Sequence, residues 1–293
     1  MELYKAVAEG KGGIVAKVVA DSVFADATDK SIRLTTLELK YPRFIHSEFM
    51  THRLFSRNAS SSRAIPVIRM VEQVEATPAH PIHWGKNQKG MQASEELQPN
   101  LPLWEDAAAT AAGYAMEFDK LGYHKQIVNR ITEPYQFIRV VCTATEWINF
   151  FNLRMHEDAQ PEIYELATRV KQAMSASTPE SLEIGEWHTP YVKDQNIPTD
   201  MALRASVARC ARVSYLNHDQ TAPDLEKDVL LHDRLSEDGH LSPFEHVATP
   251  AIDTDLSRVS SLEPGATHVD RQGTPWSGNF RGWIQYRHLK PYM

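Results

Sequence analysis

The most informative stretch of the sequence is Thr51-His52-Arg53-Leu54-Phe55-Ser56-Arg57-Asn58-Ala59-Ser60-Ser61-Ser62-Arg63. Its thirteen positions hold one His, three Arg and four Ser, and an apolar segment precedes them. Guanidinium groups bind phosphate or carboxylate through paired hydrogen bonds, and serine hydroxyls donate to the same oxygens. The stretch therefore predicts an anion-binding segment. A polar helix end followed by a serine-rich turn is the alternative that its composition leaves open.

The bulk properties of the chain exclude several classes of protein. It has 293 residues, 42 % of them hydrophobic, and a formal net charge of −7. This length suits one large domain or two small ones, and the charge disfavours a protein that coats nucleic acid. Cys142 and Cys210 lie in apolar segments, which predicts small core residues in a reducing compartment. Without a signal-peptide pattern or an apolar run of about 20 residues, we expect a cytoplasmic protein with no membrane span.

Hydrophobic periodicity predicts an α/β (α+β) fold, a mixed sheet with long helices. Residues 13–25 and 32–39 alternate like strands, and Pro42 is expected to open a helix that runs to Met50. Residues 75–103 are rich in Pro, His, Gly and Gln, which predicts a long ordered loop. Further helices are expected over 104–122, 134–156, 160–175, 201–212 and 224–237.

We expect a single domain over 1–293. The signature and the long helices fall in 1–175, a turn-rich linker in 176–200, and a second part in 201–293. Within the second part, 239–246 is predicted to be a turn that leads into a strand. The aromatic and basic tail 279–288 is expected either to pack on the core or to close over a planar ligand.

Three separated blocks resemble the flavin-dependent thymidylate synthase family. The family signature reads Arg-His-Arg, two residues, Ser-x-Asn-Glu-x-Ser-x-Arg. The residues of this chain that match it are His52, Arg53, Ser56, Asn58, Ser61 and Arg63. Arg130-Ile131-Thr132-Glu133-Pro134 resembles the Arg-Ile-Val-Leu-Pro block. Asn152-Leu153-Arg154, with Ala159-Gln160 and Glu162-Ile163, resembles the Asn-Leu-Arg … Ala-Gln-x-Glu-Ile block.

A further match has an unusual place in the order of the chain. Residues 206–215 and 239–246 resemble blocks that usual members place before the signature, whereas here they follow it. Chain termini often lie close together at the surface, so joining them and opening the chain elsewhere can preserve a fold. The order therefore predicts a circular permutation.

The resemblance implies a reaction and a set of functional residues. It implies conversion of dUMP to dTMP with methylenetetrahydrofolate as the carbon donor and NADPH reducing bound FAD, in a homotetramer whose active sites are built from several subunits. Arg154 would favour ionisation of the pyrimidine ring as the catalytic residue. The nucleotide would be held by Ser61, Arg63, Arg130 and Arg154, with Arg130 reaching it from a neighbouring subunit. FAD would be held by His52, Arg53, Asn58, Asn149 and Ser242.

Departures from the family pattern keep other functions open. Thr51 replaces the first arginine of the signature, Ala59 replaces its glutamate, and Ser47-Glu48 replaces an Arg-Gln pair. The local field becomes less positive, although Arg57 is a possible substitute. One alternative is a related flavoenzyme that adds a different group to C5 of a pyrimidine nucleotide. The other is a catalytically inactive nucleotide-binding homologue.

The histidines outside the signature give no metal-binding pattern. His80 and His83 have no Cys or carboxylate partner nearby in the sequence. Pro243 lies between His240 and His246, which is poor spacing for a single metal site. For both histidines we expect a place in the core or in the flavin pocket, and no metal is predicted.

Overall fold

The computed structural model describes residues 4–25, 31–89, 95–193, 196–215, 221–251, 268–269, 275–276 and 278–290. In this part of the chain the main sheet runs in the order β1-β2-β3-β5-β4, with β6 beside β2. Its strands are β1 (Ala6–Glu9), β2 (Val15–Ala25), β3 (Ser31–Pro42), β4 (Ser56–Ala59), β5 (Phe137–Ala144) and β6 (Glu180–Ser181). The β2–β6 pair is parallel and the other pairs are antiparallel. The predicted mixed sheet with long helices is confirmed.

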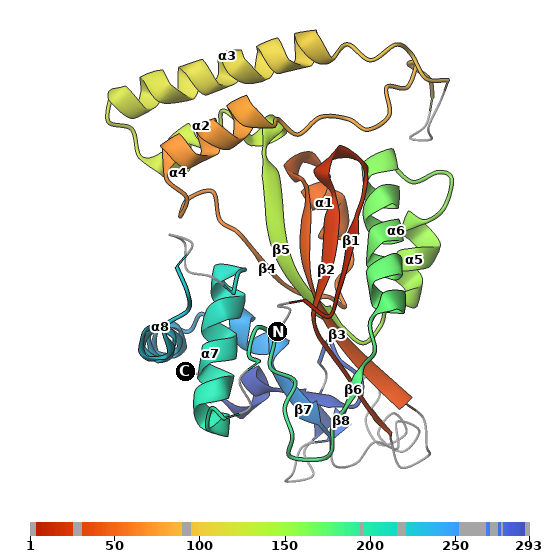
Figure 1. Cartoon of the computed structure of the whole chain (residues 1–293), viewed down its shortest axis with the longest axis vertical. Coiled ribbons are helices and arrows are strands. Elements are labelled where there is room, and N and C mark those ends of the chain that lie inside the picture. The colour runs from red at the N-terminus through yellow and green to blue at the C-terminus, as the bar shows by residue number, and fades with distance from the viewer. Residues whose placement is uncertain are drawn as a thin grey trace.

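Helices cover the sheet and extend beyond it (Figure 1). The α-helices are α1 (His46–Phe49), α2 (Val67–Ala76), α3 (Leu101–Lys120), α4 (Lys125–Val128), α5 (Ile148–Arg154), α6 (Pro161–Ala176), α7 (Thr199–Arg212) and α8 (Leu225–Glu237). The 3-10 turns are η1 (Lys11–Gly13), η2 (Arg43–Ile45), η3 (Glu133–Tyr135), η4 (Ser242–His246) and η5 (Tyr286–Leu289). Helices α5 and α6 lie beside the sheet, α2–α4 lie beyond one end of it, and α7 and α8 lie near its other end.

Two short sheets complete the fold. Strand β7 (Ala248–Pro250) pairs with β10 (Trp283–Gln285), and β8 (His268–Val269) pairs with β9 (Pro275–Trp276). No helix among the described residues is long and apolar enough to cross a membrane.

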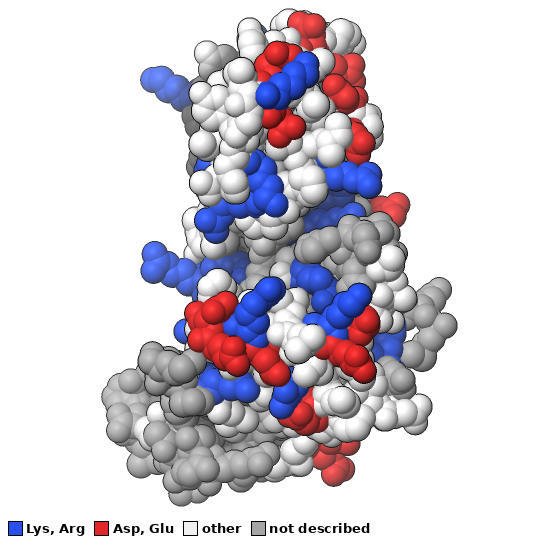
Figure 2. Space-filling model, turned by 90° about the vertical axis from the view of Figure 1, so that its left-hand side faces the viewer, with Lys and Arg blue, Asp and Glu red and all other residues white. Residues whose placement is uncertain are grey.

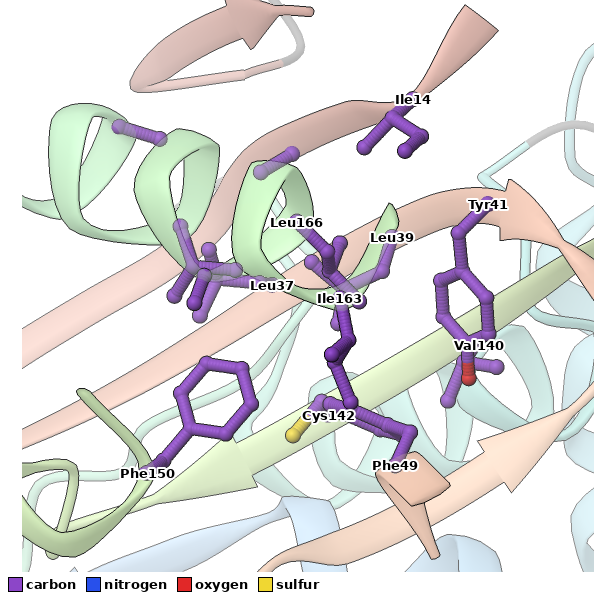
Figure 3. Close-up of a cluster of buried hydrophobic side chains, with 14 of the residues drawn as sticks. Ile14, Leu37, Leu39, Tyr41, Phe49, Val140, Cys142, Phe150, Ile163 and Leu166 are labelled. Atoms are coloured by element: carbon purple, nitrogen blue, oxygen red, sulfur yellow. The ribbon is translucent and has the colours of Figure 1, made fainter. Parts of the chain in front are cut away.

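The main core lies between the sheet and α6. Successive side chains of a strand point to opposite faces, so Leu37 and Leu39 of β3 share one face. They pack with Val140 and Cys142 of β5, and α6 contributes buried residues such as Ile163 from the other side (Figure 3). All of these side chains are fully buried, and each contributes about 1.5–3 kcal/mol when removed from water.

Helix α7 packs against part of the opposite face of the sheet, near one end. Val19 of β2 and Val141 of β5 pack against Cys210 of α7 and Tyr191 in one buried cluster. Both cysteines are free and buried, as predicted, and burial raises the pKa of each thiol. Asp228 of α8 is fully buried and accepts hydrogen bonds from two arginines of α7, which fixes α8 against α7.

Most of the predicted elements are confirmed and one is wrong. The strands over 13–25 and 32–39, the helical turn after Pro42, and the helices over 104–122, 160–175, 201–212 and 224–237 are present within a few residues. The predicted helix 134–156 is instead strand β5 followed by helix α5. Strand β5 is buried on both faces, so its apolar run has no clear alternation, and periodicity cannot distinguish such a run from a helix.

The segment 176–200 and the tail contribute to the interior. His188 and Tyr191 of the first segment are about 1 % exposed, and His188 forms a β-bridge with Ala248. In the tail, Phe280 and Trp283 are fully buried. Of the two alternatives for 279–288, packing on the core is the one observed.

Candidate functional site

The first part of the site forms where α5 ends beside the signature. Arg154 is the last residue of α5, and its Nε donates to Nε2 of His52 at 2.9 Å. Its Nη2 contacts Oγ1 of Thr51 at 3.0 Å and the carbonyl oxygen of Glu48 at 3.4 Å. These contacts leave Nη1 without a partner among the described residues. Arg154 is therefore held in one orientation with one nitrogen available to a ligand.

His52 is held in place by aromatic packing, and its ring is neutral. Its ring stacks on Phe55 and meets Phe150 edge to face, and the residue is only 7 % exposed. Burial, followed by the charges of Arg154 and Arg57, lowers the pKa of His52 to about 4. The ring is therefore neutral near pH 7. Since Nε2 accepts from Arg154, the ring proton resides on Nδ1.

The second part of the site is a pocket of about 240 Å³ at the other end of β4. Its lining residues are Arg43, His46, Ala59, Ser60, Ser61, Ser62, Arg63, Arg130 and Ile138. The structure thus brings together Ser61, Arg63 and Arg130, three of the predicted nucleotide residues, within a single chain. Three guanidinium groups and several hydroxyls around one hollow form a donor set suited to a phosphate group.

Backbone contacts position the serine loop at the edge of the sheet. Ser60 exchanges two hydrogen bonds with Arg139 of β5, through its N–H and its Oγ. The side-chain amide of Asn129 donates to the carbonyl oxygens of Ser62 at 2.6 Å and Ile65 at 3.0 Å. The backbone is fixed while the side chains of Ser61 and Arg63 remain exposed.

One carboxylate moderates the charge of the pocket. Oε1 of Glu133 lies 3.0 Å from Arg43 and 3.8 Å from Arg130. His46 adds no charge at neutral pH, because burial and the nearby charges of Arg43 and Arg57 lower its pKa to about 4. Figure 2 shows Lys and Arg side chains gathered around a hollow across the middle of one face, with acidic side chains above and below.

The remaining predicted cofactor residues lie outside the pocket that contains Ser61, Arg63 and Arg130. Arg53, Asn149 and Ser242 are exposed on three separate segments, and none of them lines that pocket. Ser242 begins η4, which packs against β4. Asn58 lies within β4, and its Oδ1 is buried with no partner among the described residues.

Sequence reasoning missed Arg43 and His46. Arg43 follows directly after the long strand β3, and its position just before the signature was the available signal. Arg57 is half-buried, and its Nη1 donates to the carbonyl oxygen of Phe49 at 3.2 Å. This contact ties Arg57 to the end of α1, and its role as a substitute for the missing arginine at position 51 stays a prediction.

The departures from the family pattern have defined places. Thr51 contacts Arg154 directly, and its hydroxyl donates to the carbonyl oxygen of Glu48 at 2.7 Å. The carboxylate of Glu48 turns away to accept from Ser47 at 3.0 Å. Ala59 lines the pocket and offers it no acid. Among the described residues, no group of three or more His, Cys, Asp or Glu is arranged to hold a metal ion.

Comparison with known families identifies this arrangement. The comparison with curated proteins gave no match. The model of the family described as thymidylate synthase complementing protein matches residues 33–180, just over half of the chain. The matched region contains the signature, the serine loop, Arg130 and Arg154. The chain therefore belongs to this family, the flavin-dependent thymidylate synthases, and is an enzyme of that class.

Proposed function

We propose that this enzyme methylates C5 of a pyrimidine deoxynucleotide, converting dUMP to dTMP with methylenetetrahydrofolate and NADPH. The observation that carries the proposal is the fixed Arg154 at one end of β4, with one nitrogen unbonded within the described part of the chain, and the phosphate-type pocket at the other end. Both are features that a nucleotide substrate requires, a cation for its base and guanidinium groups for its phosphate.

Arg154 would act on the pyrimidine ring through charge. A fixed cation in a partly water-excluded site stabilises negative charge as it develops, and it needs no reorganisation during the reaction. Neutral His52 accepts from Nε of Arg154 and so orients the guanidinium group without cancelling its charge. Thr51 holds Nη2. Nη1 is then the nitrogen that faces the substrate.

Several residues fit the flavin by the chemistry of their donors. Four polar groups suit the ring edge and the phosphates of FAD: the buried Oδ1 of Asn58, which has no partner among the residues described, the exposed amide of Asn149, the hydroxyl of Ser242 and the guanidinium of Arg53. FAD, when bound, supplies hydride chemistry that no protein side chain provides. Because Arg53, Asn149 and Ser242 lie on separate exposed segments, we propose that a homo-oligomer, a tetramer by resemblance, completes the site with residues from more than one subunit.

A circular permutation accounts for the order of the blocks. The family match ends at residue 180, and the two blocks expected before the signature lie in α7 and η4. Helix η4 packs against β4, the strand that carries the signature. This neighbourhood supports our proposal that the old termini were joined and new ones opened elsewhere.

Mass spectrometry of the nucleotide tests the proposed reaction. The purified protein is incubated without oxygen with FAD, NADPH, methylenetetrahydrofolate and dUMP. We expect dUMP to gain one CH₂ unit. Unchanged dUMP with bound and reduced flavin would support the alternative of a different C5 substituent or pyrimidine. Unchanged dUMP with no bound flavin would support the inactive nucleotide-binding homologue.

Removing Arg63 and Arg130 is expected to weaken nucleotide binding. Each charged hydrogen bond contributes about 1.5–3 kcal/mol, so each alanine substitution is expected to raise the Kd for dUMP by roughly 10–100-fold. Isothermal titration calorimetry measures this effect. Deoxyuridine, which lacks the phosphate, serves as the control ligand. An equal loss of affinity for deoxyuridine would contradict a phosphate role for these arginines.

Thr51 is expected to act as a positioning residue for Arg154. Thr51→Ala removes a hydrogen bond worth about 0.5–1.5 kcal/mol, which corresponds to a loss of roughly 2–10-fold in kcat at little change in KM. Thr51→Ser keeps the hydroxyl and is expected to retain wild-type kcat. If the serine and alanine variants lose the same activity, the hydroxyl contact with Arg154 is not what position 51 contributes.

A further inference from the structure

A continuous chain of buried hydrogen bonds crosses the sheet away from the site described above. It runs from Ser22 of β2 through His188 and Thr36 of β3 to Thr143 of β5 and His246 of η4. The distances in order are 2.8 Å, 2.7 Å, 2.7 Å and 2.8 Å. All five side chains are at most 5 % exposed. Three separate strands and two distant segments supply these side chains, so the hydrogen-bond path forms only in the folded protein.

The two ends of this hydrogen-bond path have different surroundings. Ser22 and His188 line a pocket of about 530 Å³, together with Lys5, Asp21, Glu180 and Glu186. At the other end, Nε2 of His246 is fully buried and has no partner among the described residues. His246 closes η4, which begins with Ser242 and packs against the signature strand β4. One end thus reaches a polar pocket, while the other ends beside the proposed flavin site.

The hydrogen atoms of this hydrogen-bond path have two arrangements in which every contact has one donor and one acceptor. In each neutral histidine ring, one nitrogen donates a hydrogen bond and the other accepts one. If Ser22 donates to His188, each following group donates toward His246, and both rings carry their proton on Nε2. If the direction is reversed, both rings carry it on Nδ1. A mixed pair either leaves the contact between Thr36 and Thr143 without a hydrogen or directs one hydroxyl away from the chain.

We propose that this chain is a proton path between the buried side of η4 and the pocket lined by Ser22 and His188. In the Nδ1 form, a proton binds Nε2 of His246, and the Nδ1 proton passes to Oγ1 of Thr143. The hydroxyl proton of Thr143 passes to Thr36, and that of Thr36 to Nε2 of His188. The Nδ1 proton of His188 passes to Ser22, whose own proton leaves to solvent in the pocket.

The balance of this transfer is complete. One proton enters at His246 and one leaves at Ser22, and every group along the path ends neutral with its hydrogen bonds reversed. Before the next proton enters at His246, the hydroxyls rotate and both rings change back to the Nδ1 tautomer. Burial keeps both rings neutral near pH 7, since it lowers the pKa of His188 and of His246 to about 3. Neither ring traps the proton.

The tautomers of the two histidines provide the first test, and they do not depend on the proposed reaction. Nitrogen NMR of the full chain labelled at the histidine ring nitrogens distinguishes Nδ1–H from Nε2–H. At pH 7 we expect His188 and His246 to share one tautomer, or to exchange between the two together. Stable opposite tautomers would overturn the proton path, whether or not the protein methylates dUMP.

Exchange of the ring N–H of His246 with solvent provides the second test. Thr36→Val preserves shape but removes the central hydroxyl, and we expect it to slow this exchange at least tenfold. The control is Thr35→Val on the same strand. Thr35 is equally buried and donates to Asp21 at 3.1 Å, outside the path. Wild-type exchange in the Thr36 variant, or equal slowing in both variants, would overturn the proposal.

Discussion

Arg154→Ala is expected to lower kcat for dUMP methylation by about 10²–10³-fold, the range for loss of one preorganised group that stabilises developing charge. The physical reason is the geometry of its contacts. His52, Thr51 and the carbonyl oxygen of Glu48 fix the guanidinium group before substrate arrives. Removing the side chain leaves the pyrimidine ring without a fixed cation. Steady-state kinetics with saturating dUMP measure the change in kcat.

Arg154→Lys separates charge from geometry. Lysine keeps a positive charge but lacks the planar fork that contacts His52 and Thr51 at once, so we expect it to recover only a small part of the lost activity. Arg69→Ala is the matched control, because Arg69 is an exposed arginine on α2 whose ion pair is with Glu72. An Arg154→Ala variant with wild-type kcat would refute the central role assigned to this residue.

Asp228→Ala is expected to reduce the free energy of unfolding by about 3–5 kcal/mol, the usual result of removing one member of a buried ion pair. Asp228 is fully buried and accepts from Arg209 at 2.8 Å and from Arg212 at 2.6 Å. Its loss leaves the buried guanidinium of Arg209 without a counter-charge between α7 and α8. Urea denaturation monitored by circular dichroism measures the effect.

The control for this stability prediction lies on α7 itself. Asp200 pairs with Arg204 at 3.0 Å, but its side chain is 66 % exposed. Exposed pairs of this kind contribute about 0.2–1 kcal/mol, so Asp200→Ala is expected to stay close to wild type. If both variants unfold at the same urea concentration, the buried network around Asp228 does not fix α8 as inferred.

Ser61, Arg63 and Arg154 are predictable from the sequence because the motif that indicates each of them is local. The spacing of Ser61 and Arg63 within the signature, and the Asn-Leu-Arg ending at Arg154, each lie on one short segment. Family resemblance supplied their roles. The pocket that joins Ser61 and Arg63 to Arg130 depends on the fold, since Asn129 holds the serine loop from more than sixty residues away.

The errors have a physical cause as well. The sequence of strand β5 reads as a helix because the strand is buried on both faces, so its apolar residues show no alternation. The contact of Thr51 with Arg154 could not be read from the sequence, because a short hydroxyl in place of an arginine carries no sign of what it touches. The buried chain from Ser22 to His246 joins five distant positions and has no local pattern at all.

The position of α7 after the signature also governs how the chain is completed during synthesis. Val19 and Val141 form an apolar surface on the sheet that Cys210 of α7 covers. About 70 residues separate Val141 from Cys210, which at about 5–20 residues per second leaves that surface uncovered for roughly 4–14 s. The nascent sheet is therefore aggregation-prone in this interval, and slower translation before residue 210 prolongs its need for a chaperone.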